Sequence, residues 1–475
     1  MKTVVKKINP ENMSSEDFAL AAQLLREGKL VAFPTETVYG LGGDAYDKTA
    51  SARIYAAKGR PSDNPLIVHI AEIGELEKLA VNIPEEAYLL AEKFWPGPMT
   101  MILNRKDTVP KETTGGLDTV AIRMPSHPIA RRLIIESGLP IAAPSANASG
   151  RPSTTKAEHV IEDLDGKIDM IIDGGSSDIG LESTIVDLTV KPALILRPGY
   201  ITKEMLQEVL PDIEYDKAVL KRVRDDTIVA KAPGMKYRHY APKGQLTIFE
   251  GEREKVIARI VSEVREKMKE NLRVGILAST DYLKSYIGGI FDGEASPEVQ
   301  NAIAEALNSG VAEAGQNTSE ALNAGVAEAG QNTSEALNSG AEEAGQNTSE
   351  ALNVGAEEAG QNTSEALNVG AEEVGQNTSD VAGTADNVEN VRECVSANGK
   401  QSENSDIFEI GNVVIGIVGS RNDEATIAAR LFDILREYDT KKIDYIYAEC
   451  FASDNLGQAI MNRLLKAAGY HIETL

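Results

Sequence analysis

Residues 58–69 read KGRPSDNPLIVH, a polar loop with two prolines that leads directly into an apolar run. Two cations, Lys58 and Arg60, stand two positions apart, and the prolines restrict the backbone around them. The run LIVHI at 66–70 is short, apolar and typical of a buried strand. Cations on a stiff loop beside a strand can bind an anion, or they can form a solvated corner of the surface. This stretch alone permits both interpretations.

The same pattern of apolar strands and intervening helices continues through the first 210 residues. Apolar periodicity predicts helices near 16–28, 49–57, 85–94, 127–136 and 156–163. It predicts strands at 30–33, 66–70, 99–103, 119–124, 140–144, 169–173, 183–188 and 193–197. Eight strands are more than a simple doubly wound sheet would order, so we expect a mixed, twisted α/β sheet.

Polar side chains cluster at the ends of these predicted strands, where open α/β sheets build their sites. Four cations lie in these stretches: Lys58 and Arg60 in one, Arg123 in a second and Arg197 in a third. Hydroxyl and amide groups accompany them at Thr35, Asn64, Ser145, Asn147 and Ser153. Arginine forks match phosphate oxygens, so the set suits a polyphosphate. A lone arginine in a strand, such as Arg123, is more often one half of a structural ion pair, but several such pieces in one region favour a functional site. The sequence contains no Walker GxxxxGK[ST] motif.

The chain after residue 243 predicts a second, smaller domain. Strands are expected at 245–249, 273–279, 412–420 and 443–450, with helices at 251–270, 423–437 and 456–468. Alternation of strand and helix is typical of a parallel, Rossmann-like α/β domain. Its boundaries are predicted as 244–475, after a first domain at 1–211 and a linker at 212–243.

A repeat of 15 residues interrupts this second domain. GQNTSE begins at Gly315 and recurs at Gly330, Gly345 and Gly360, and GQNTSD begins at Gly375. Each unit is poor in large apolar side chains, so it buries too little to offset the entropy of ordering it. We interpret about 295–405 as a low-complexity insertion. A weak helix broken at each glycine is the alternative.

Charge is spread unevenly along the 475 residues, whose formal net charge is −25. Residues 1–243 hold 31 Lys and Arg against 34 Asp and Glu, whereas residues 300–405 hold 2 against 18. The first half is therefore free to build a local basic pocket for an anionic ligand. With no signal-like start, no apolar run of eighteen residues and only two cysteines, we expect a cytoplasmic protein without stable membrane contact.

Long motifs identify a family resemblance. PTETVYGLGGDA, KGRPSDNPLIVH, FWPGPMTMIL, VAIRMPSHP, APSANASGRPSTT and ESTIVDL…ILRPG follow one another in the order of the YrdC-like family. APGMKYRHYAP at 232–242 and the trailing α/β domain are similar to the long, two-domain form of that family. The resemblance covers about 1–290 and 406–475, and the repeat array departs from it.

The resemblance implies a nucleotidyltransferase. L-threonine, bicarbonate or CO2, and ATP with Mg²⁺ would give threonylcarbamoyl-adenylate and pyrophosphate. A partner transferase complex would then place the threonylcarbamoyl group (t6A) on adenosine 37 of tRNA. Whether the protein itself binds tRNA stays open. The attacked atom would be the α-phosphorus, for which in-line geometry and charge neutralisation matter more than a protein nucleophile. The ligands of Mg²⁺ are not assigned.

Site roles are carried over by motif. Lys58 and Arg60 are implied as catalytic cations. ATP would lie near Lys58, Arg60, Asn64, Thr119, Ser145, Asn147, Ser153, Arg197 and Tyr237. Threonine would lie near Thr35, His69, Arg123, Ala143 and Ser183, with its carboxylate on the Arg123 fork. Without the resemblance, His69 would be interpreted as a core histidine.

The linker suggests a lid, and two other functions are weighed. Its large aromatic side chains, Tyr237 or Tyr240, would fold back and shield the adenylate from water. An RNA-binding module using a basic concave face is the main alternative. A carbamoyl-adenylate former of hydrogenase maturation is disfavoured, because the chain has neither the cysteine pairs nor the acylphosphatase segment of those proteins.

Overall fold

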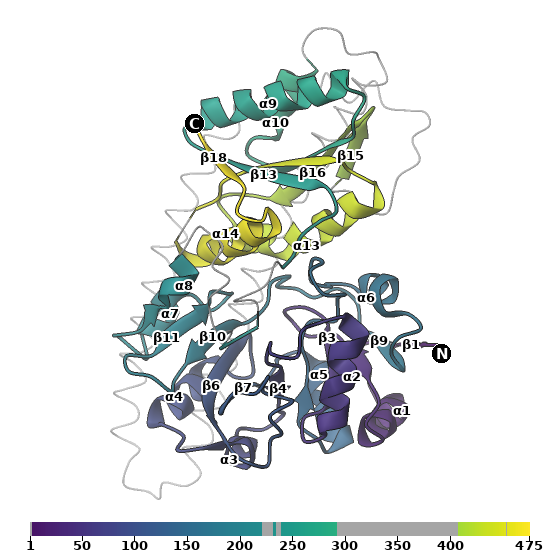
Figure 1. Cartoon of the computed structure of the whole chain (residues 1–475), viewed down its shortest axis with the longest axis vertical. Coiled ribbons are helices and arrows are strands. Elements are labelled where there is room, and N and C mark those ends of the chain that lie inside the picture. The colour runs from purple at the N-terminus through teal and green to yellow at the C-terminus, as the bar shows by residue number, and fades with distance from the viewer. Residues whose placement is uncertain (1, 221–230, 234–238, 292–406, 453) are drawn as a thin grey trace, which may run out of the picture. The chain divides into compact units, whose positions relative to one another are not determined.

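The computed structural model describes the chain except for residues 1, 221–230, 234–238, 292–406 and 453. Among the described residues, the strands gather into two sheets, one of twelve strands and one of six (Figure 1). The predicted insertion and Tyr237 lie outside the described residues, so our interpretations of both stay predictions.

The first sheet is mixed and twisted, as predicted. Its strands are β1 (Val4–Lys7), β2 (Val31–Phe33), β3 (Gly40–Asp44), β4 (Ile67–His69), β5 (Ala80–Val81), β6 (Met99–Arg105), β7 (Thr119–Arg123), β8 (Ile141–Ala142), β9 (Met170–Asp173), β10 (Thr184–Asp187), β11 (Leu194–Arg197) and β12 (Glu214–Tyr215). The order is β1-β9-β2-β3-β8-β4-β7-β6-β10-β11-β12, with β5 beside β6. β4 pairs with β7 in parallel, whereas β6 pairs with β7 antiparallel.

Helices cover this sheet and follow the predicted positions closely. They are α1 (Ser15–Arg26), α2 (Lys48–Lys58), α3 (Leu76–Leu79), α4 (Glu85–Phe94), α5 (Pro128–Ser137), α6 (Ala157–Leu164), α7 (Lys203–Gln207) and α8 (Lys217–Leu220), with a short 3₁₀ turn at Ile73–Glu75. β12 and α8 fall in the segment predicted as linker, and β12 pairs with β11 of the sheet.

The end of α2 corrects one detail of the opening loop. The Asp47 side chain accepts a hydrogen bond from the backbone of Thr49 and starts the helix. Gly59, with φ +63°, ends it in the left-handed conformation that glycine adopts without steric cost. Lys58 is therefore the last residue of a helix, and only Arg60 stands on the proline-bounded loop.

The second fold is a Rossmann-like sheet. Its strands are β13 (Gln245–Glu250), β14 (Val274–Ser279), β15 (Ile407–Ile410), β16 (Val413–Gly419), β17 (Tyr445–Glu449) and β18 (Ile472–Thr474), in the order β15-β16-β14-β17-β13-β18. Helices α9 (Arg253–Lys269) and α10 (Leu283–Ile290) cover one face, and α13 (Glu424–Thr440) and α14 (Asn455–Ala467) cover the other (Figure 1).

One edge of this sheet differs from the parallel arrangement that we expected. β15 pairs antiparallel with β16, because a turn at Gly411, with φ +60°, reverses the chain between them. The other described pairs of this sheet are parallel.

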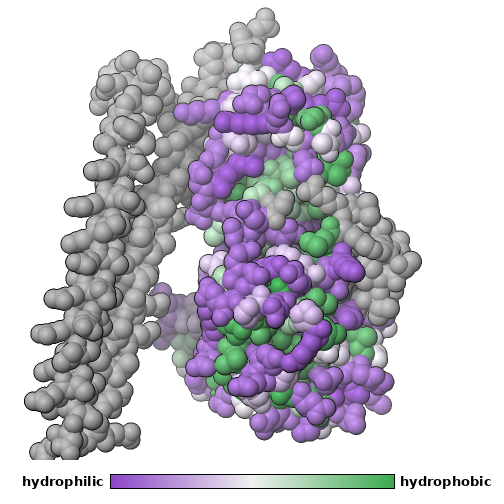
Figure 2. Space-filling view, turned by 90° about the vertical axis from the view of Figure 1, so that its left-hand side faces the viewer, coloured by the Kyte–Doolittle hydropathy of each residue, from purple (hydrophilic) through white to green (hydrophobic). Residues whose placement is uncertain are grey.

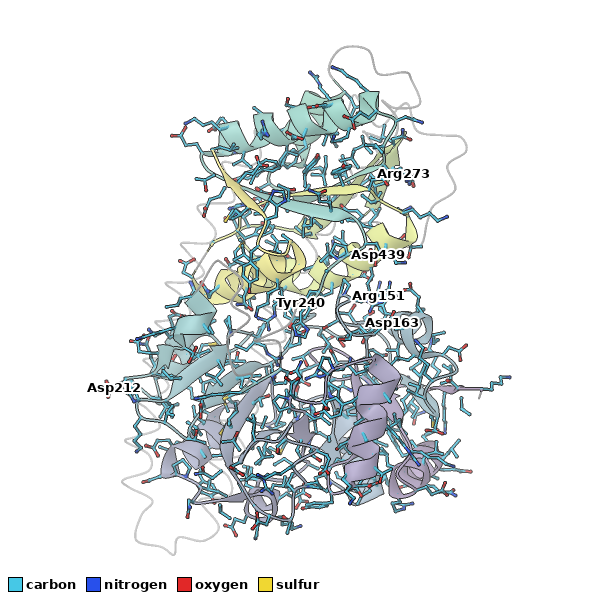
Figure 3. The ribbon with its side chains drawn as sticks, in the orientation of Figure 1. Arg151, Asp163, Asp212, Tyr240, Arg273 and Asp439 are labelled. Atoms are coloured by element: carbon cyan, nitrogen blue, oxygen red, sulfur yellow. The ribbon has the colours of Figure 1, made fainter. Side chains whose placement is uncertain are left out.

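Charged side chains join the two folds. Arg436 of α13 is fully buried, and its guanidinium donates to Asp163 Oδ2 at 2.8 Å and to the carbonyl of Pro152 at 2.6 Å. Arg151 contacts Asp163, and its Nη2 lies 3.3 Å from Asp439 Oδ2 (Figure 3). Hydrogen bonds of these kinds attach α13 directly to the first fold.

The visible surface in Figure 2 is mostly hydrophilic, with hydrophobic residues in small separate patches. Among the helices of the described segments, none combines the length and the hydropathy required of a bilayer span.

Candidate functional site

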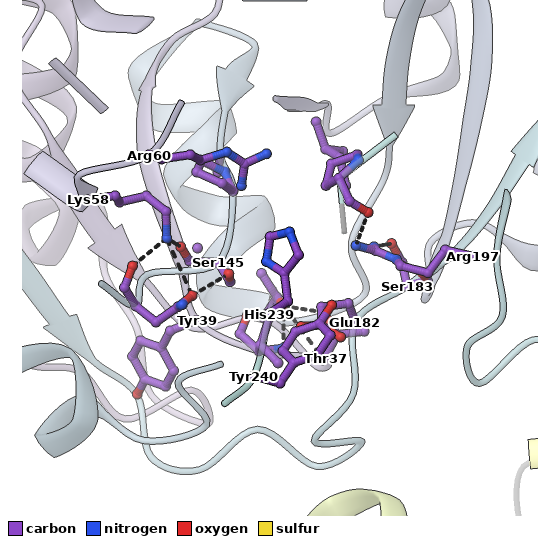
Figure 4. Close-up of a pocket in the computed structure, with 18 of the residues that line it drawn as sticks. Thr37, Tyr39, Lys58, Arg60, Ser145, Glu182, Ser183, Arg197, His239 and Tyr240 are labelled. Carbon is purple, nitrogen blue, oxygen red and sulfur yellow. Dashed lines mark hydrogen bonds between the residues drawn. The ribbon is translucent and has the colours of Figure 1, made fainter. Parts of the chain in front are cut away.

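Most of the predicted site residues surround one pocket in the first fold (Figure 4). Those that line it are Thr35, Lys58, Arg60, His69, Arg123, Ala143, Ser145, Asn147, Ser183 and Arg197. Sequence reasoning did not assign several other lining residues: Thr37, Tyr39, Gly40, Glu182, Pro233 and His239. The cavity left among these side chains is about 50 Å³.

Strand pairing explains why residues distant in sequence meet here. β4 and β7 run parallel, with His69 opposite Arg123 at their carboxyl ends. Arg123 also lies opposite Thr100 on the antiparallel strand β6. β10 begins beside the start of β6, immediately after Ser183, and the hydroxyls of Ser183 and Thr100 are 2.7 Å apart. The pocket therefore forms at strand ends, as expected for an α/β sheet.

Lys58 anchors one wall of the pocket. Its Nζ donates to the carbonyl oxygens of Ser145 and Asn147, each at 2.5 Å. The Ser145 hydroxyl in turn donates to Asn147 Oδ1 at 2.5 Å. Burial, followed by the charge of Arg60, lowers the pKa of Lys58 well below its ordinary value. An incoming anion would favour the charged ammonium again.

Arg60 is held by its own loop. Its Nη2 donates to the carbonyls of Asn64 at 3.1 Å and Pro65 at 2.9 Å, while its buried Nε has no hydrogen-bond partner among the described residues. Burial lowers the pKa of Arg60 to about 10. Because Lys58 and Arg60 both line the pocket, the solvated-corner interpretation of this stretch is wrong.

Arg123 is both an ion-pair partner and a pocket residue. Its Nη2 lies 2.7 Å from Glu36 Oε1, and its Nη1 donates to the Thr37 hydroxyl at 2.8 Å. The contact with Glu36 is close but lacks hydrogen-bond geometry, so Nη2 still has N–H capacity for a ligand. Burial tends to raise the pKa of Glu36, but the charge of Arg123 lowers it overall.

Arg197 approaches from the other side. Its Nε donates to the carbonyl of Ser183 at 3.0 Å and its Nη2 to the Ser183 hydroxyl at 3.1 Å. Burial lowers the pKa of Arg197 to about 10, and the nearby Glu182 carboxylate opposes that shift. The hydroxyl of Ser183 therefore links Arg197 to the Arg123 region through Thr100.

His69 is a satisfied core histidine that also faces the pocket. Its Nδ1 lies 3.1 Å from the carbonyl of Ile67, and its ring meets Phe33 edge-on with centroids 6.2 Å apart. Burial, together with the charge of Arg123, lowers the pKa of His69 to about 3. The ring is neutral at physiological pH.

The neutral state of His69 predicts a pH dependence of stability. In the unfolded chain His69 takes up a proton near pH 6.5, whereas in the folded protein it does so only near pH 3. The contribution of neutral His69 to the free energy of unfolding is therefore complete above pH 6.5. The free energy of unfolding should fall on acidification below pH 6.5, by up to about 1.4 kcal/mol per pH unit from this group. His69→Gln should remove that part of the slope. Denaturant titrations between pH 7 and 4 measure it, and equal slopes in both proteins would contradict the prediction.

Residues of the predicted linker occupy the pocket. His239 and Tyr240 line it (Figure 4). The ring of Tyr240 also packs on Phe432 of α13, with ring centroids 5.0 Å apart. Burial lowers the pKa of His239 to about 3, so this ring too is neutral. These contacts are those that a lid would make, although the lid itself stays a prediction.

Four predicted nucleotide residues are not among the described residues that line the pocket: Asn64, Thr119, Ser153 and Tyr237. Asn64 remains close, through its carbonyl contact with Arg60. The hydroxyl of Ser153 donates to the lining residue Glu182 at 2.5 Å. Thr119 begins β7 and Arg123 ends it, so about 13 Å of strand separates them. The roles of these four residues stay predictions.

Two family models match the chain over most of its length. The model for Sua5, YciO and YrdC proteins, described as "Telomere recombination", matches residues 23–199. The model described as "Threonylcarbamoyl-AMP synthase, C-terminal domain" matches residues 201–469. The chain belongs to the threonylcarbamoyl-AMP synthase family. The resemblance predicted from the motifs is thereby confirmed.

Known members of the threonylcarbamoyl-AMP synthase family are similar at high identity. The enzyme of that name from Pyrococcus abyssi is 50% identical over 297 residues, which cover 62% of this chain and 86% of the relative. The Bacillus subtilis enzyme is 51% identical over 286 residues, covering 58% and 80%. The crystal structure of P. abyssi Sua5 complexed with L-threonine matches with a TM-score of 0.68 at 35% identity, covering 100% of both chains.

These similarities support an enzyme of the threonylcarbamoyl-AMP synthase family with a role in tRNA processing. They also confirm the predicted fold class, a YrdC-like domain followed by a smaller α/β domain. Within the described residues, no three His, Cys, Asp or Glu side chains gather in a way that would hold a metal ion.

Proposed function

We propose that the protein synthesises threonylcarbamoyl-adenylate from L-threonine, bicarbonate or CO2, and ATP. The threonine nitrogen bonds to the carbon of CO2 and loses a proton. An oxygen of the resulting carbamate bonds to the α-phosphorus of ATP, and the bond from that phosphorus to its bridging oxygen breaks to release pyrophosphate. This makes the protein a nucleotidyltransferase that supplies the first step of t6A formation at position 37 of tRNA, and a transferase complex takes the product.

The observation that carries the proposal is the convergence of four cations on one buried pocket. Lys58, Arg60, Arg123 and Arg197 come from three separate segments and share the lining with hydroxyl and amide groups. A pocket of this composition suits a carboxylate and a polyphosphate together. The L-threonine complex of P. abyssi Sua5 supports threonine as the amino acid.

We assign the part of the pocket around Arg123 to L-threonine and call it the threonine half. The free N–H group of Arg123 Nη2 donates to the amino-acid carboxylate, and Glu36 and Thr37 fix the plane of the guanidinium. Thr35, Ser183 and the backbone of Ala143 surround the rest of the substrate. Neutral His69 adds no second positive charge at this point.

We assign the part of the pocket bounded by Lys58, Arg60 and Arg197 to ATP and call it the nucleotide half. Lys58 and Arg60 lie against the triphosphate and stabilise the negative charge that develops on the departing pyrophosphate. The carbonyl contacts of both side chains hold them in place before the nucleotide arrives, so little reorganisation is needed.

Magnesium fits this scheme as a companion of ATP. Glu182, which lines the pocket, and Glu36, which lies behind Arg123, are both already ion-paired with arginines. Hydroxyl and amide oxygens, such as those of Ser145 and Asn147, together with the phosphates, match the oxygen ligands that Mg²⁺ prefers. When bound, Mg²⁺ supplies charge neutralisation between phosphate oxygens.

Calorimetric titration tests the proposal. Purified protein is titrated with L-threonine and, separately, with L-serine, each with and without a non-hydrolysable ATP analogue and Mg²⁺. L-threonine should bind more tightly than L-serine, because the extra methyl group fills apolar space worth about 1 kcal/mol or more. With ATP and bicarbonate, mass spectrometry should then detect threonylcarbamoyl-adenylate and pyrophosphate. Absence of amino-acid binding under every condition would overturn the proposal and favour the RNA-binding alternative.

A further inference from the structure

Glu182 places a buried carboxylate in the wall of a pocket that otherwise gathers cations. It is 6% exposed and precedes Ser183 at the start of β10. Its Oε1 accepts a hydrogen bond from the hydroxyl of Ser153 at 2.5 Å. Burial tends to raise the pKa of Glu182, but the charges of Arg463 and Arg197 lower it overall, so the group is an anion.

The partner that balances this anion comes from the second fold. Arg463 lies on α14 and is fully buried. Its Nε donates to Glu182 Oε2 at 3.0 Å, its Nη1 to the carbonyl of Pro198 at 2.6 Å, and its Nη2 to the carbonyl of Glu182 at 3.2 Å. The guanidinium therefore donates hydrogen bonds to both the side chain and the backbone of Glu182.

Electrostatics give this contact a consequence for the ligand. An unbalanced carboxylate in a buried pocket would repel a polyphosphate and would compete with it for Arg197. Arg463 does not line the pocket, so it balances Glu182 without touching the ligand. Glu182 is then free to hold Ser153 while Arg197 keeps its charge available for phosphate.

We propose that Arg463 is a positioning residue for the nucleotide half of the site, through which the second fold makes the pocket able to accept ATP. It acts by neutralising and orienting Glu182. The inference rests on the proposed function, because it assigns the anion beside Arg197 as the triphosphate.

A charge-rescue cycle tests it in the full-length protein. Arg463→Met leaves the Glu182 carboxylate unbalanced and should weaken binding of a non-hydrolysable ATP analogue by about tenfold or more, as close charge pairs of this kind couple strongly. Glu182→Gln removes the anion and keeps an amide oxygen that can accept from Ser153, so the affinity of this variant is the reference for the cycle. The double variant Glu182→Gln/Arg463→Met should recover the affinity of Glu182→Gln. L-threonine binding should change less than ATP-analogue binding, since the substrate carboxylate is assigned to Arg123, which pairs with Glu36 and not with Glu182.

The double variant separates this role from simple domain attachment. If Arg463 only attached α14 to the first fold, neutralising Glu182 would not restore ATP-analogue binding, and a double variant as weak as Arg463→Met would overturn the proposal. Should Arg463→Met fail to fold, Arg463→Lys carries the test, because it keeps the charge and should keep most of the affinity. If a folded Arg463→Lys protein bound the ATP analogue as weakly as a protein without the ion pair, that result would also overturn the proposal.

Asp433→Asn is the matched control. Asp433 of α13 forms an ion pair between the folds with Lys156 at 2.7 Å, and neither residue lines the pocket. Its removal should leave ATP-analogue and L-threonine affinity unchanged, and a loss equal to that of Arg463→Met would overturn a specific role for Arg463. Wild-type protein that binds neither ligand would refute the proposed function and this inference together. Wild-type protein that binds both while the cycle shows no coupling would refute this inference alone.

Discussion

Arg123→Met is expected to abolish L-threonine binding. The substitution removes the guanidinium assigned to the substrate carboxylate, and loss of one partner of a buried charge pair costs roughly 2–5 kcal/mol, or more than about 30-fold in affinity. Calorimetric titration with L-threonine measures the change. Binding of an ATP analogue should persist, because Lys58, Arg60 and Arg197 remain.

Two further variants make this result interpretable. Arg123→Met leaves Glu36 buried without its partner, so the double variant Glu36→Gln/Arg123→Met removes that unbalanced charge and should fold while still failing to bind threonine. Arg132→Met is the control, because Arg132 pairs with Glu136 on the outer surface of α5 and is 41% exposed. Wild-type threonine affinity in the double variant would show that the carboxylate site lies elsewhere.

Lys58→Met is expected to reduce kcat/KM for adenylate formation by about 10²–10³-fold, the loss typical of removing one preorganised charge stabiliser. The physical reason is twofold: the triphosphate loses a cation, and the carbonyls of Ser145 and Asn147 lose their shared donor. Release of pyrophosphate in the presence of L-threonine and bicarbonate measures the rate. Threonine affinity should remain at the wild-type value.

Lys48→Met provides the matched comparison for Lys58→Met. Lys48 begins the same helix that Lys58 ends, and it is exposed. It should therefore leave both the rate and the stability close to wild type. If Lys58→Met lost threonine binding as severely as turnover, the separation of the pocket into a threonine half and a nucleotide half would be wrong.

Local sequence patterns were sufficient for much of the fold. α4 occupies the predicted range 85–94, and every strand predicted in the first 210 residues is present within a few residues. β3 was missed because its sequence, GLGGD, lacks the β-branched and aromatic residues of a strand. The structure supplies the reason: a Cβ at Gly42 would lie 2.7 Å from Cγ2 of Ile141, so a neighbouring strand leaves no room for a side chain there.

The pocket shows more clearly which features depend on local sequence and which depend on the tertiary structure. The sequence by itself indicated the four cations that line the pocket and the hydroxyls of Thr35, Ser145 and Ser183, because each lies beside a recognisable strand end or in a long motif. The sequence could not indicate which charged partners balance the buried charges of the pocket. Glu36 is next to a predicted residue, yet its pairing with Arg123 bridges 87 positions, and Arg463 reaches Glu182 across 281 positions. Only the tertiary structure decided these pairings, because the partner of a buried charge depends on which strands and helices pack together and not on any local pattern.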